Sequence, residues 1–324
     1  MPLVSIVIVC MNRPDNLYPC LESIRHYTGV PHEIFVVAYL FDKAALAKLK
    51  EEFPDVNFIE SDEIRGFAEN NNLAFPLTKG RYILCLNDDT CLFFPTIDKL
   101  ANDFKLLPED AALLSPRIEY PDGQVQTCGR PVQTAQKYIL SRYHLGAPDG
   151  DDTLGRKPFK NALFRTSDIN GACFLIRRDI FEQLGWLDER YFFTPEDIAL
   201  STLAREKGYS VWVDADASVI HYHQQTAGRL VTATRPAGMR GYLMFHSHGS
   251  TLRYGAIGLA VALAEAGKWT LSGLKLVLGS GNKHLRTQHT VYSHNLRSIF
   301  TRRSPKEIFI RYYEALRRAD TPSA

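Results

Sequence analysis

Apolar runs alternate with amphipathic segments along the first 110 residues of the chain. Four runs are short, rich in β-branched residues and bounded by polar ones, as is typical of buried strands: 3–10, 33–38, 56–59 and 82–87. Three segments between them carry apolar residues at helical spacing: 15–26, 43–52 and 66–77. This alternation predicts an α/β fold in which helices cover a mostly parallel sheet.

The pattern changes further along the chain. Residues 120–168 are rich in Gly, Pro and Asp and predict irregular loops with one or two short strands. Strands are then expected at 173–176, 211–214 and 218–222, and helices at 178–184 and 194–207. From about residue 230 the pattern is helical throughout. We therefore expect an α/β domain over residues 1–228 and a helical C-terminal region over residues 229–324.

Polar residues that directly follow the predicted strands are candidates for a binding site, because ligands of such sheets lie beyond the carboxyl ends of the strands. They are Asn12 with Arg13, Tyr39 with Asp42, and Asp88 with Asp89. Two familiar phosphate-binding loops are excluded. The first strand leads into CMNRPDN and not into GxGxxG, and the sequence contains no GxxxxGK[ST].

The tetrapeptide Asn87-Asp88-Asp89-Thr90 follows the fourth predicted strand. Its adjacent carboxylates and amide are the hard oxygen ligands that bind Mg²⁺ or Mn²⁺ and, through the ion, a diphosphate. The same residue types are common in turns and helix caps, so a purely structural role stays open at this point.

Two further motifs allow two readings each. Thr194-Pro195-Glu196-Asp197 is a favourable helix start, with Thr at the N-cap and Pro at the first helical position. The same position suits a general base, since the helix dipole keeps a carboxylate there ionised. His221 and His223 lie two residues apart on a strand and share a face, where they are either structural or metal ligands.

Five segments occur in an order that is more specific than any single motif: VSIVIVCMNRPDNLYPCLESI, IRGFAENNNLAF, GRYILCLNDDT, INGACFLIRRDIFEQLGWLDERYFFTPEDIALSTLAREKGY and VIHYHQQTAG. Over about residues 3–228 this order resembles the family 2 glycosyltransferases of the GT-A fold, and most closely the rhamnosyltransferase-like branch of bacterial surface polysaccharide synthesis. The resemblance implies that 87–89 is the DxD-type motif. It also implies that Asp89 and His221 hold Mn²⁺ or Mg²⁺, with His223 as a substitute ligand.

The resemblance assigns roles to other positions as well. Asp197 would be the catalytic base, with Glu196 beside it in the ED pair. The nucleotide would be bordered by Cys10, Asn12, Arg13, Tyr39, Asp42, Arg65, Gly66, Asn70, Asn87 and Asp88. The donor and acceptor sugars would lie near Gly171, Ala172, Trp186 and Asp188.

One position departs from the family pattern. Family members carry an acidic residue at the end of the second strand that contacts the base, whereas this chain has Ala38 there. Asp42 or Tyr39 would have to replace that contact, so the identity of the base stays open.

The expected reaction is the inverting transfer of a sugar from a UDP- or dTDP-linked donor to a hydroxyl of a glycan or lipid-linked acceptor. One alternative is a catalytically silent protein that binds a sugar nucleotide or glycan on the same fold. Another is a nucleotidyltransferase on a similar sheet, which would carry a Gly-rich basic loop after the first strand; CMNRPDN is not one.

Composition restricts the setting. The chain is 45% hydrophobic and 23% charged, which excludes a disordered or coiled-coil protein. Its six cysteines form no CxxC pair, which argues against a zinc ribbon and a disulfide framework and favours a reducing, cytoplasmic compartment. The N-terminal apolar run has no basic region ahead of it, so it predicts a first strand and not a signal peptide.

Charge is segregated along the chain. Residues 229–324 hold 15 Lys and Arg against 4 Asp and Glu, whereas residues 1–228 hold 23 against 32. A basic region of this kind favours an anionic partner, and the acidic remainder, without a recognition motif, argues against nucleic acid.

Residues 256–280 are apolar but are interrupted by Glu265, Lys268 and Lys275, which argues against a transmembrane segment. They predict an amphipathic helix with Leu263 and Leu274 away from the charged face. A final basic helix is expected after the capping box that begins at Ser304. Contact with an anionic surface at the inner face of the cell membrane and packing against the protein itself or a second subunit both stay open.

Overall fold

The computed structural model describes residues 1–145, 162–222, 228–279 and 281–320. The chain forms two compact units. The first comprises Met1–Gln133, Gly150–Asp188 and Glu196–Thr226, and the second comprises Thr134–Asp149, Glu189–Pro195 and Ala227–Ala324. The second unit therefore includes two segments that precede residue 228 in the sequence.

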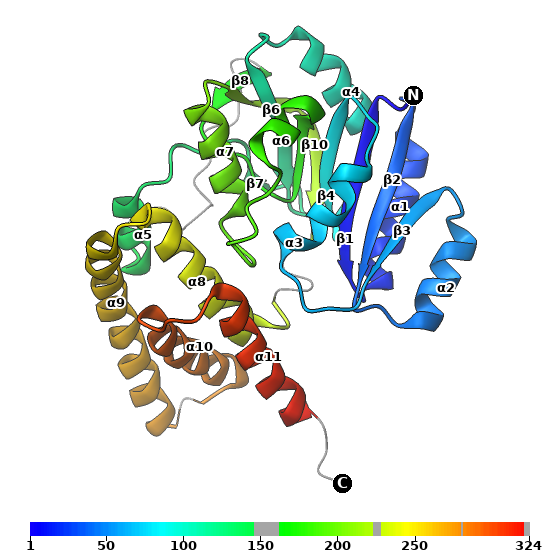
Figure 1. Cartoon of the computed structure of the whole chain (residues 1–324). Helices are drawn as coiled ribbons and strands as arrows, with labels where there is room; N and C mark the ends of the chain where they lie inside the picture. The colour runs from blue at the N-terminus through cyan, green and yellow to red at the C-terminus, as the bar shows by residue number, and fades with distance from the viewer. Residues whose placement is uncertain (146–161, 223–227, 280, 321–324) are drawn as a thin grey trace. The chain divides into compact units, whose positions relative to one another are not determined.

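The first unit contains a ten-stranded sheet in the order β3-β2-β1-β4-β9-β6-β10-β5, with β7 beside β6 and β8 beside β10 (Figure 1). The four strands predicted near the N-terminus are confirmed as β1 (Val4–Met11), β2 (His32–Tyr39), β3 (Val56–Ser61) and β4 (Tyr82–Asn87). The others are β5 (Thr90–Cys91), β6 (Ala111–Glu119), β7 (Val125–Thr127), β8 (Leu163–Thr166), β9 (Cys173–Arg177) and β10 (Ser210–His221). The four longest pairings are parallel, as predicted.

The antiparallel strand β9 lies between β4 and β6. It starts at the end of the sheet where β4 finishes, since the Asn87 N–H donates to the Ala172 carbonyl at 2.9 Å, and it therefore runs back against β4. The strands predicted at 211–214 and 218–222 are one strand, β10, whose register with β6 shifts between Asp214 and Ser218. That shift lies opposite Pro116 of β6, which has no N–H to offer the ladder.

Helices cover both faces of this sheet, because side chains alternate along each buried strand. Ile6 and Ile8 belong to one apolar cluster and Val7 to the other. The first cluster is completed by α1 (Pro14–Tyr27), α2 (Lys43–Glu52) and α4 (Thr96–Asp103), which continues into η2 (Phe104–Leu106). The second is completed by α3 (Phe67–Ala74) with η1 (Phe75–Leu77), α6 (Arg178–Leu184) and α7 (Glu196–Glu206).

The second unit consists of α5 (Ala135–Arg142), α8 (Val231–Ser247), α9 (Thr251–Val277), α10 (Lys283–Ile299) and α11 (Pro305–Asp320). Its core is formed by Tyr138, Met239, Leu243, Ile257, Val261 and Ile299. The predicted capping box is present, with the Ser304 N–H donating to Glu307 and the Glu307 N–H donating to the Ser304 hydroxyl. Helix α5 falls in a stretch expected to be loop.

Two further expectations concern the whole chain. All six cysteine thiols are free, in agreement with the absence of a disulfide framework. Among the described residues, no helix combines the length and the apolar character that crossing a bilayer requires.

Candidate functional site

Strand pairing brings the two ends of the predicted metal site together. Thr90 of β5 lies opposite His221 of β10, and the Tyr222 N–H donates to the Asp89 carbonyl at 2.9 Å. As a result, Nε2 of His221 lies 3.1 Å from Oδ1 of Asp89, although the two residues are far apart in sequence. Both residues are almost completely buried.

The imidazole of His221 is oriented by a residue that the sequence analysis missed. Its Nδ1 lies 2.7 Å from Oε1 of Gln126, and an amide oxygen only accepts hydrogen bonds. The Nδ1 atom therefore carries the proton and donates it, which leaves Nε2 with a lone pair toward Asp89 in the neutral ring. A histidine held in this way is prepared to bind a cation.

The residues present fit a divalent metal ion. Asp89 Oδ1 and His221 Nε2 lie 3.1 Å apart, a separation that suits either a proton on Nε2 or a cation between the two atoms. Ligands at right angles around an ion at about 2.1 Å lie about 3 Å apart, close to this separation. Among the described residues no group of three or more Asp, Glu, His or Cys side chains is arranged to hold a metal. Such an ion would therefore draw further ligands from water and from the phosphates of a substrate, as Mg²⁺ commonly does.

Asp88 points away from solvent beside this pair. Burial raises the pKa of the Asp88 carboxyl to about 7, and the negative charge of Asp89 contributes, whereas the Cys10 thiol and Arg13 oppose the shift. Its Oδ2 atom is buried and has no hydrogen-bond partner among the described residues. Burial also raises the pKa of the Cys10 thiol well above its usual range, so that this residue is a neutral neighbour of the carboxylate.

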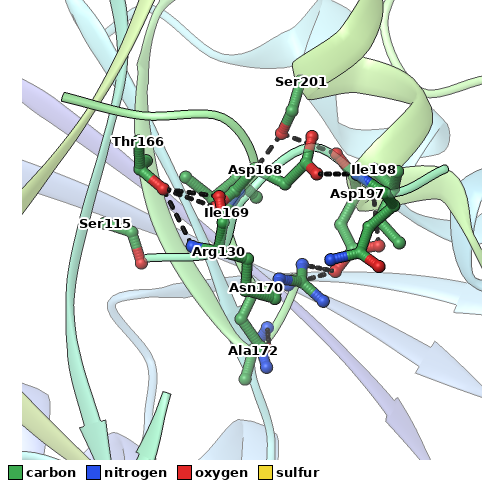
Figure 2. Close-up of polar contacts among 12 residues, drawn as sticks. Ser115, Arg130, Thr166, Asp168, Ile169, Asn170, Ala172, Asp197, Ile198 and Ser201 are labelled. Atoms are coloured by element: carbon green, nitrogen blue, oxygen red, sulfur yellow. Dashed lines mark hydrogen bonds and ion pairs between the residues drawn. The ribbon is translucent and has the colours of Figure 1, made fainter. Parts of the chain in front are cut away.

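Asp197 lies in the first turn of α7 and is held by three donors (Figure 2). Its Oδ2 accepts from the guanidinium of Arg130 at 2.7 Å and from the Gly171 N–H at 3.0 Å. Its Oδ1 accepts from the Ile198 N–H at 2.8 Å. The carboxylate is thus fixed in one orientation and neutralised by a cation. Its side chain keeps 14% of its surface exposed, which leaves it accessible to a substrate.

Arg130 was not predicted from the sequence, because it lies in the stretch that lacks periodicity. The structure places it in an isolated β-bridge with Asp168, in which its N–H also donates to the Thr166 hydroxyl at 2.8 Å (Figure 2). Asp168 in turn accepts from Arg205 at 3.3 Å. Burial raises the pKa of Asp168 to about 6, while Arg130 and Arg205 oppose that shift.

Glu196 differs from Asp197, its neighbour in the ED pair. Burial raises the pKa of the Glu196 carboxyl well above its usual range, and the charge of Asp197 adds to the effect. Its Oε2 atom has no hydrogen-bond partner among the described residues. Burial therefore favours the neutral form of Glu196, whereas Asp197 forms an ion pair with Arg130.

Gly171 and Ala172 link the two parts of the site. The Gly171 N–H donates to Asp197, and the Ala172 carbonyl accepts from the Asn87 N–H. A Cβ atom on residue 171 would lie 3.4 Å from Glu196 Oε1 and 3.5 Å from Asp197 Cβ. These are ordinary van der Waals distances, so Gly171 lies against the ED pair and leaves room for a Cβ atom.

The predicted nucleotide-side residues form a second group at the ends of β1, β2 and β3. Asn12, at a φ of 46°, accepts from the Asp42 N–H at 2.9 Å. The carboxylate of Asp42 is the N-cap of α2 and accepts from the Ala45 N–H at 2.9 Å. Arg13 forms an ion pair with Asp15 at 2.6 Å.

The remaining members of this group lie around Ser61. The Tyr39 hydroxyl accepts from the Arg65 N–H at 3.2 Å, and the Arg65 guanidinium donates to the Ser61 hydroxyl at 3.0 Å. Asn70 accepts from the same hydroxyl at 2.8 Å. Gly66 is the N-cap of α3.

Trp186 and Asp188 are not joined to either group by the contacts described above. The Trp186 ring packs on Phe181 and Phe75, with centroids 5.1 and 5.8 Å apart. Asp188, two residues further along the chain, is partly buried. His223 lies outside the described residues. Ala38 is buried within β2, opposite Cys10 and Glu60.

The architecture is that of the GT-A glycosyltransferases. GalNAc-T7, solved with UDP, GalNAc and Mn²⁺, aligns with a TM-score of 0.53 and 16% identity over 73% of this chain and 51% of its own. The mannosyltransferase PcManGT from Pyrobaculum calidifontis, solved with GDP-Man and Mn²⁺, aligns with a TM-score of 0.52 and 17% identity over 92% of this chain and 86% of its own.

The sequence defines the family. Residues 5–185 match glycosyl transferase family 2, and the chain belongs to this family. O-antigen biosynthesis protein RfbC of Myxococcus xanthus is 26% identical over 227 residues, which is 68% of this chain and 17% of that protein. N-acetylglucosaminyl-diphospho-decaprenol L-rhamnosyltransferase of Mycobacterium tuberculosis is 30% identical over 158 residues, which is 46% of this chain and 49% of that protein. The names of these relatives support the assignment of this chain to the rhamnosyltransferase-like branch of the family. The chain spans about half of the length of the mycobacterial relative and less than a fifth of the length of RfbC.

Proposed function

We propose that this chain transfers a sugar, with inversion, from a nucleotide-diphosphate sugar to a hydroxyl of a glycan or lipid-linked acceptor. One observation carries the proposal: consecutive residues connect the DxD-type motif to the carboxylate of the ED pair. Asn87 bonds to Ala172 at 2.9 Å, and Gly171 bonds to Asp197 at 3.0 Å. Donor diphosphate and acceptor hydroxyl would therefore be bound at a fixed separation, which is the main requirement for a direct transfer.

On the donor side, Asp89 and His221 would hold Mn²⁺ or Mg²⁺, and Gln126 orients the imidazole for this role. When bound, the ion supplies positive charge that stabilises the leaving diphosphate. Asn12, Arg13 and the residues around Ser61 would border the nucleotide. Since Ala38 replaces the family acid, the contact with the base would be made by Asp42 or by Tyr39, whose hydroxyl accepts from the Arg65 N–H.

On the acceptor side, Asp197 would accept the proton of the attacking hydroxyl. The hydroxyl oxygen forms a bond to the anomeric carbon, the bond from that carbon to the diphosphate breaks, and the proton moves to the carboxylate. A carboxylate has about four lone-pair sites, of which Arg130, Gly171 and Ile198 occupy three. Attack from the face opposite the leaving group inverts the anomeric configuration.

The comparisons support a choice of substrates to test first. The mycobacterial relative is named for rhamnosyl transfer to a diphospho-decaprenol acceptor, and the two structural neighbours were solved with UDP and with GDP-Man. UDP- and dTDP-linked donors and a lipid-linked acceptor are therefore proposed for this chain, with GDP-linked donors as the comparison.

The experiment is a screen of UDP-, dTDP- and GDP-sugars with the full chain, with Mn²⁺ or with EDTA. Released nucleoside diphosphate and the anomeric configuration of the product are measured, the latter by NMR. Turnover of one donor class, dependent on the ion and with inverted product, supports the proposal. Tight binding of a donor without any turnover, on lipid-linked and free glycan acceptors, would instead support the silent binding protein.

A further inference from the structure

Helix α9 of the second unit has its charged face directed inward. Glu265 is completely buried, and its carboxylate accepts from Arg142 of α5 and from Asn295 of α10, both at 2.7 Å. Ser272 lies about two helical turns beyond Glu265 on the same face, and its hydroxyl is 2.8 Å from Nδ1 of His289 of α10. The Coulomb attraction of Arg142 and the two hydrogen bonds oppose burial and lower the pKa of Glu265, so it is an ionised internal contact.

The opposite face of α9 is apolar and exposed. At 100° per residue, its members lie within an arc of roughly 60° and along about 38 Å of the helix. Their exposed fractions exceed one half: Leu252 88%, Leu259 58%, Leu263 62%, Leu274 55% and Val277 85%. We call these five residues the outer stripe.

Single exposed leucines are ordinary on protein surfaces, but several of them aligned on one helix face mark a contact surface, here in two groups separated by the exposed Gly267 and Thr270. The inward polar contacts of α9 also fix its rotation, because turning the helix would expose the Glu265 ion pair and bury the outer stripe. The packing of the second unit therefore determines that the outer stripe is exposed.

The surroundings of the stripe favour an anionic surface as its partner. Arg253 is exposed on one side of the stripe and Trp269, 42% exposed, on the other. Lys275 is also exposed, about 100° around the helix from Leu274 and toward the polar face. Residues 229–324 hold 15 basic and 4 acidic residues, and Glu265 is paired inside the unit with Arg142 and with Lys268. A second copy of the chain would bring the same positive charge to the contact, which opposes self-association.

We propose that α9 lies along an anionic membrane surface, with the outer stripe in the boundary between headgroups and acyl chains. Leu, Val and Trp residues enter this boundary, and the flanking Lys and Arg interact with acidic headgroups. The proposal concerns a partner surface of the second unit and is independent of the reaction proposed above.

The test is co-sedimentation of the full chain with vesicles of phosphatidylcholine alone or mixed with phosphatidylglycerol. Wild type should bind the anionic vesicles, bind the neutral ones weakly, and be released by high salt. The double variant Leu263→Ser with Leu274→Ser should lower the bound-to-free ratio by about tenfold or more, because each leucine contributes apolar burial. Leu106→Ser, which alters a 74% exposed leucine of the first unit, should bind like wild type.

Thermal unfolding of all variants shows that the double variant is folded, and sedimentation velocity without lipid gives the oligomeric state. The proposal is overturned if wild type ignores anionic vesicles or if the double variant binds them as wild type does. It is equally overturned if wild type is a dimer that the double variant converts to a monomer while neither binds lipid, since the stripe would then be a subunit interface.

Discussion

The guanidinium of Arg130 lies 2.7 Å from Oδ2 of Asp197, and their side chains are only 4% and 14% exposed. A buried charge pair of this kind contributes little net stability but is costly to break, because the remaining charge loses its partner. Arg130 is itself held by the bridge to Asp168. The pair therefore fixes the position and charge of the proposed base.

Replacing Arg130 should impair catalysis more than donor binding. Arg130→Met removes the cation and one of the donors that orient Asp197, so we expect kcat to fall by about 10- to 100-fold with little change in the donor KM. Arg130→Lys keeps the charge and should recover part of this loss. Arg165→Met is the control, because Arg165 forms an exposed ion pair with Asp110 at 3.2 Å and should behave like wild type. An unchanged kcat in Arg130→Met would mean that the pair is structural only.

Asp197→Asn should remove the proposed base while preserving its shape. We expect turnover to fall by about 10²- to 10⁴-fold, the usual size of a general-base contribution, with nucleotide-sugar binding nearly unchanged. Asp168 still faces Arg130, so the variant should fold, which thermal unfolding checks. Asp179→Asn is the matched control, since Asp179 is also a first-turn carboxylate paired with an arginine. Retention of more than about a tenth of the turnover would return Asp197 to a capping role.

Asp89→Ala and His221→Ala should each abolish the metal dependence of nucleoside diphosphate binding. Calorimetry with Mn²⁺ and with EDTA measures this directly. Gln126→Leu should weaken the apparent affinity for Mn²⁺ by about 10- to 100-fold, because it removes the oxygen that accepts the Nδ1–H hydrogen bond and so orients His221. Asp122→Asn, at an exposed turn, is the control. Nucleotide affinity that is insensitive to EDTA and to all of these changes would contradict the metal assignment.

The sequence was sufficient for features that depend on local pattern. The apolar run of β4 and the carboxylates after it follow from periodicity and residue type, as does the helix start at the ED pair. The contacts of Arg130 with Asp197 and of Gln126 with His221 join residues 67 and 95 positions apart. Arg130 and Gln126 both lie in residues 120–168, where the sequence shows no periodicity that could have revealed them. Periodicity likewise reveals two faces of α9, but which face turns inward depends on Arg142 and Asn295, which lie on other helices.

The second unit should lose stability in mild acid through His246. Burial lowers the pKa of His246 to about 4, and the positive charges of His248 and Arg253 contribute. An unfolded histidine titrates near 6.5, so between about pH 6.5 and 4 the unfolded chain binds a proton that the folded chain does not. The free energy of unfolding therefore falls as the pH falls, by about 2 kcal/mol between pH 7 and 5.

The variant His246→Phe should reduce this pH dependence. It removes the titrating group and keeps the aromatic contact with Tyr138, whose ring centroid is 5.1 Å away. Part of the slope should remain, because burial also lowers the pKa of His294 in the same unit. His284→Gln, at an exposed position, should keep the wild-type slope. Thermal unfolding of the three proteins from pH 5 to 8 provides the measurement, and equal slopes in wild type and His246→Phe would show that another group causes the acid sensitivity.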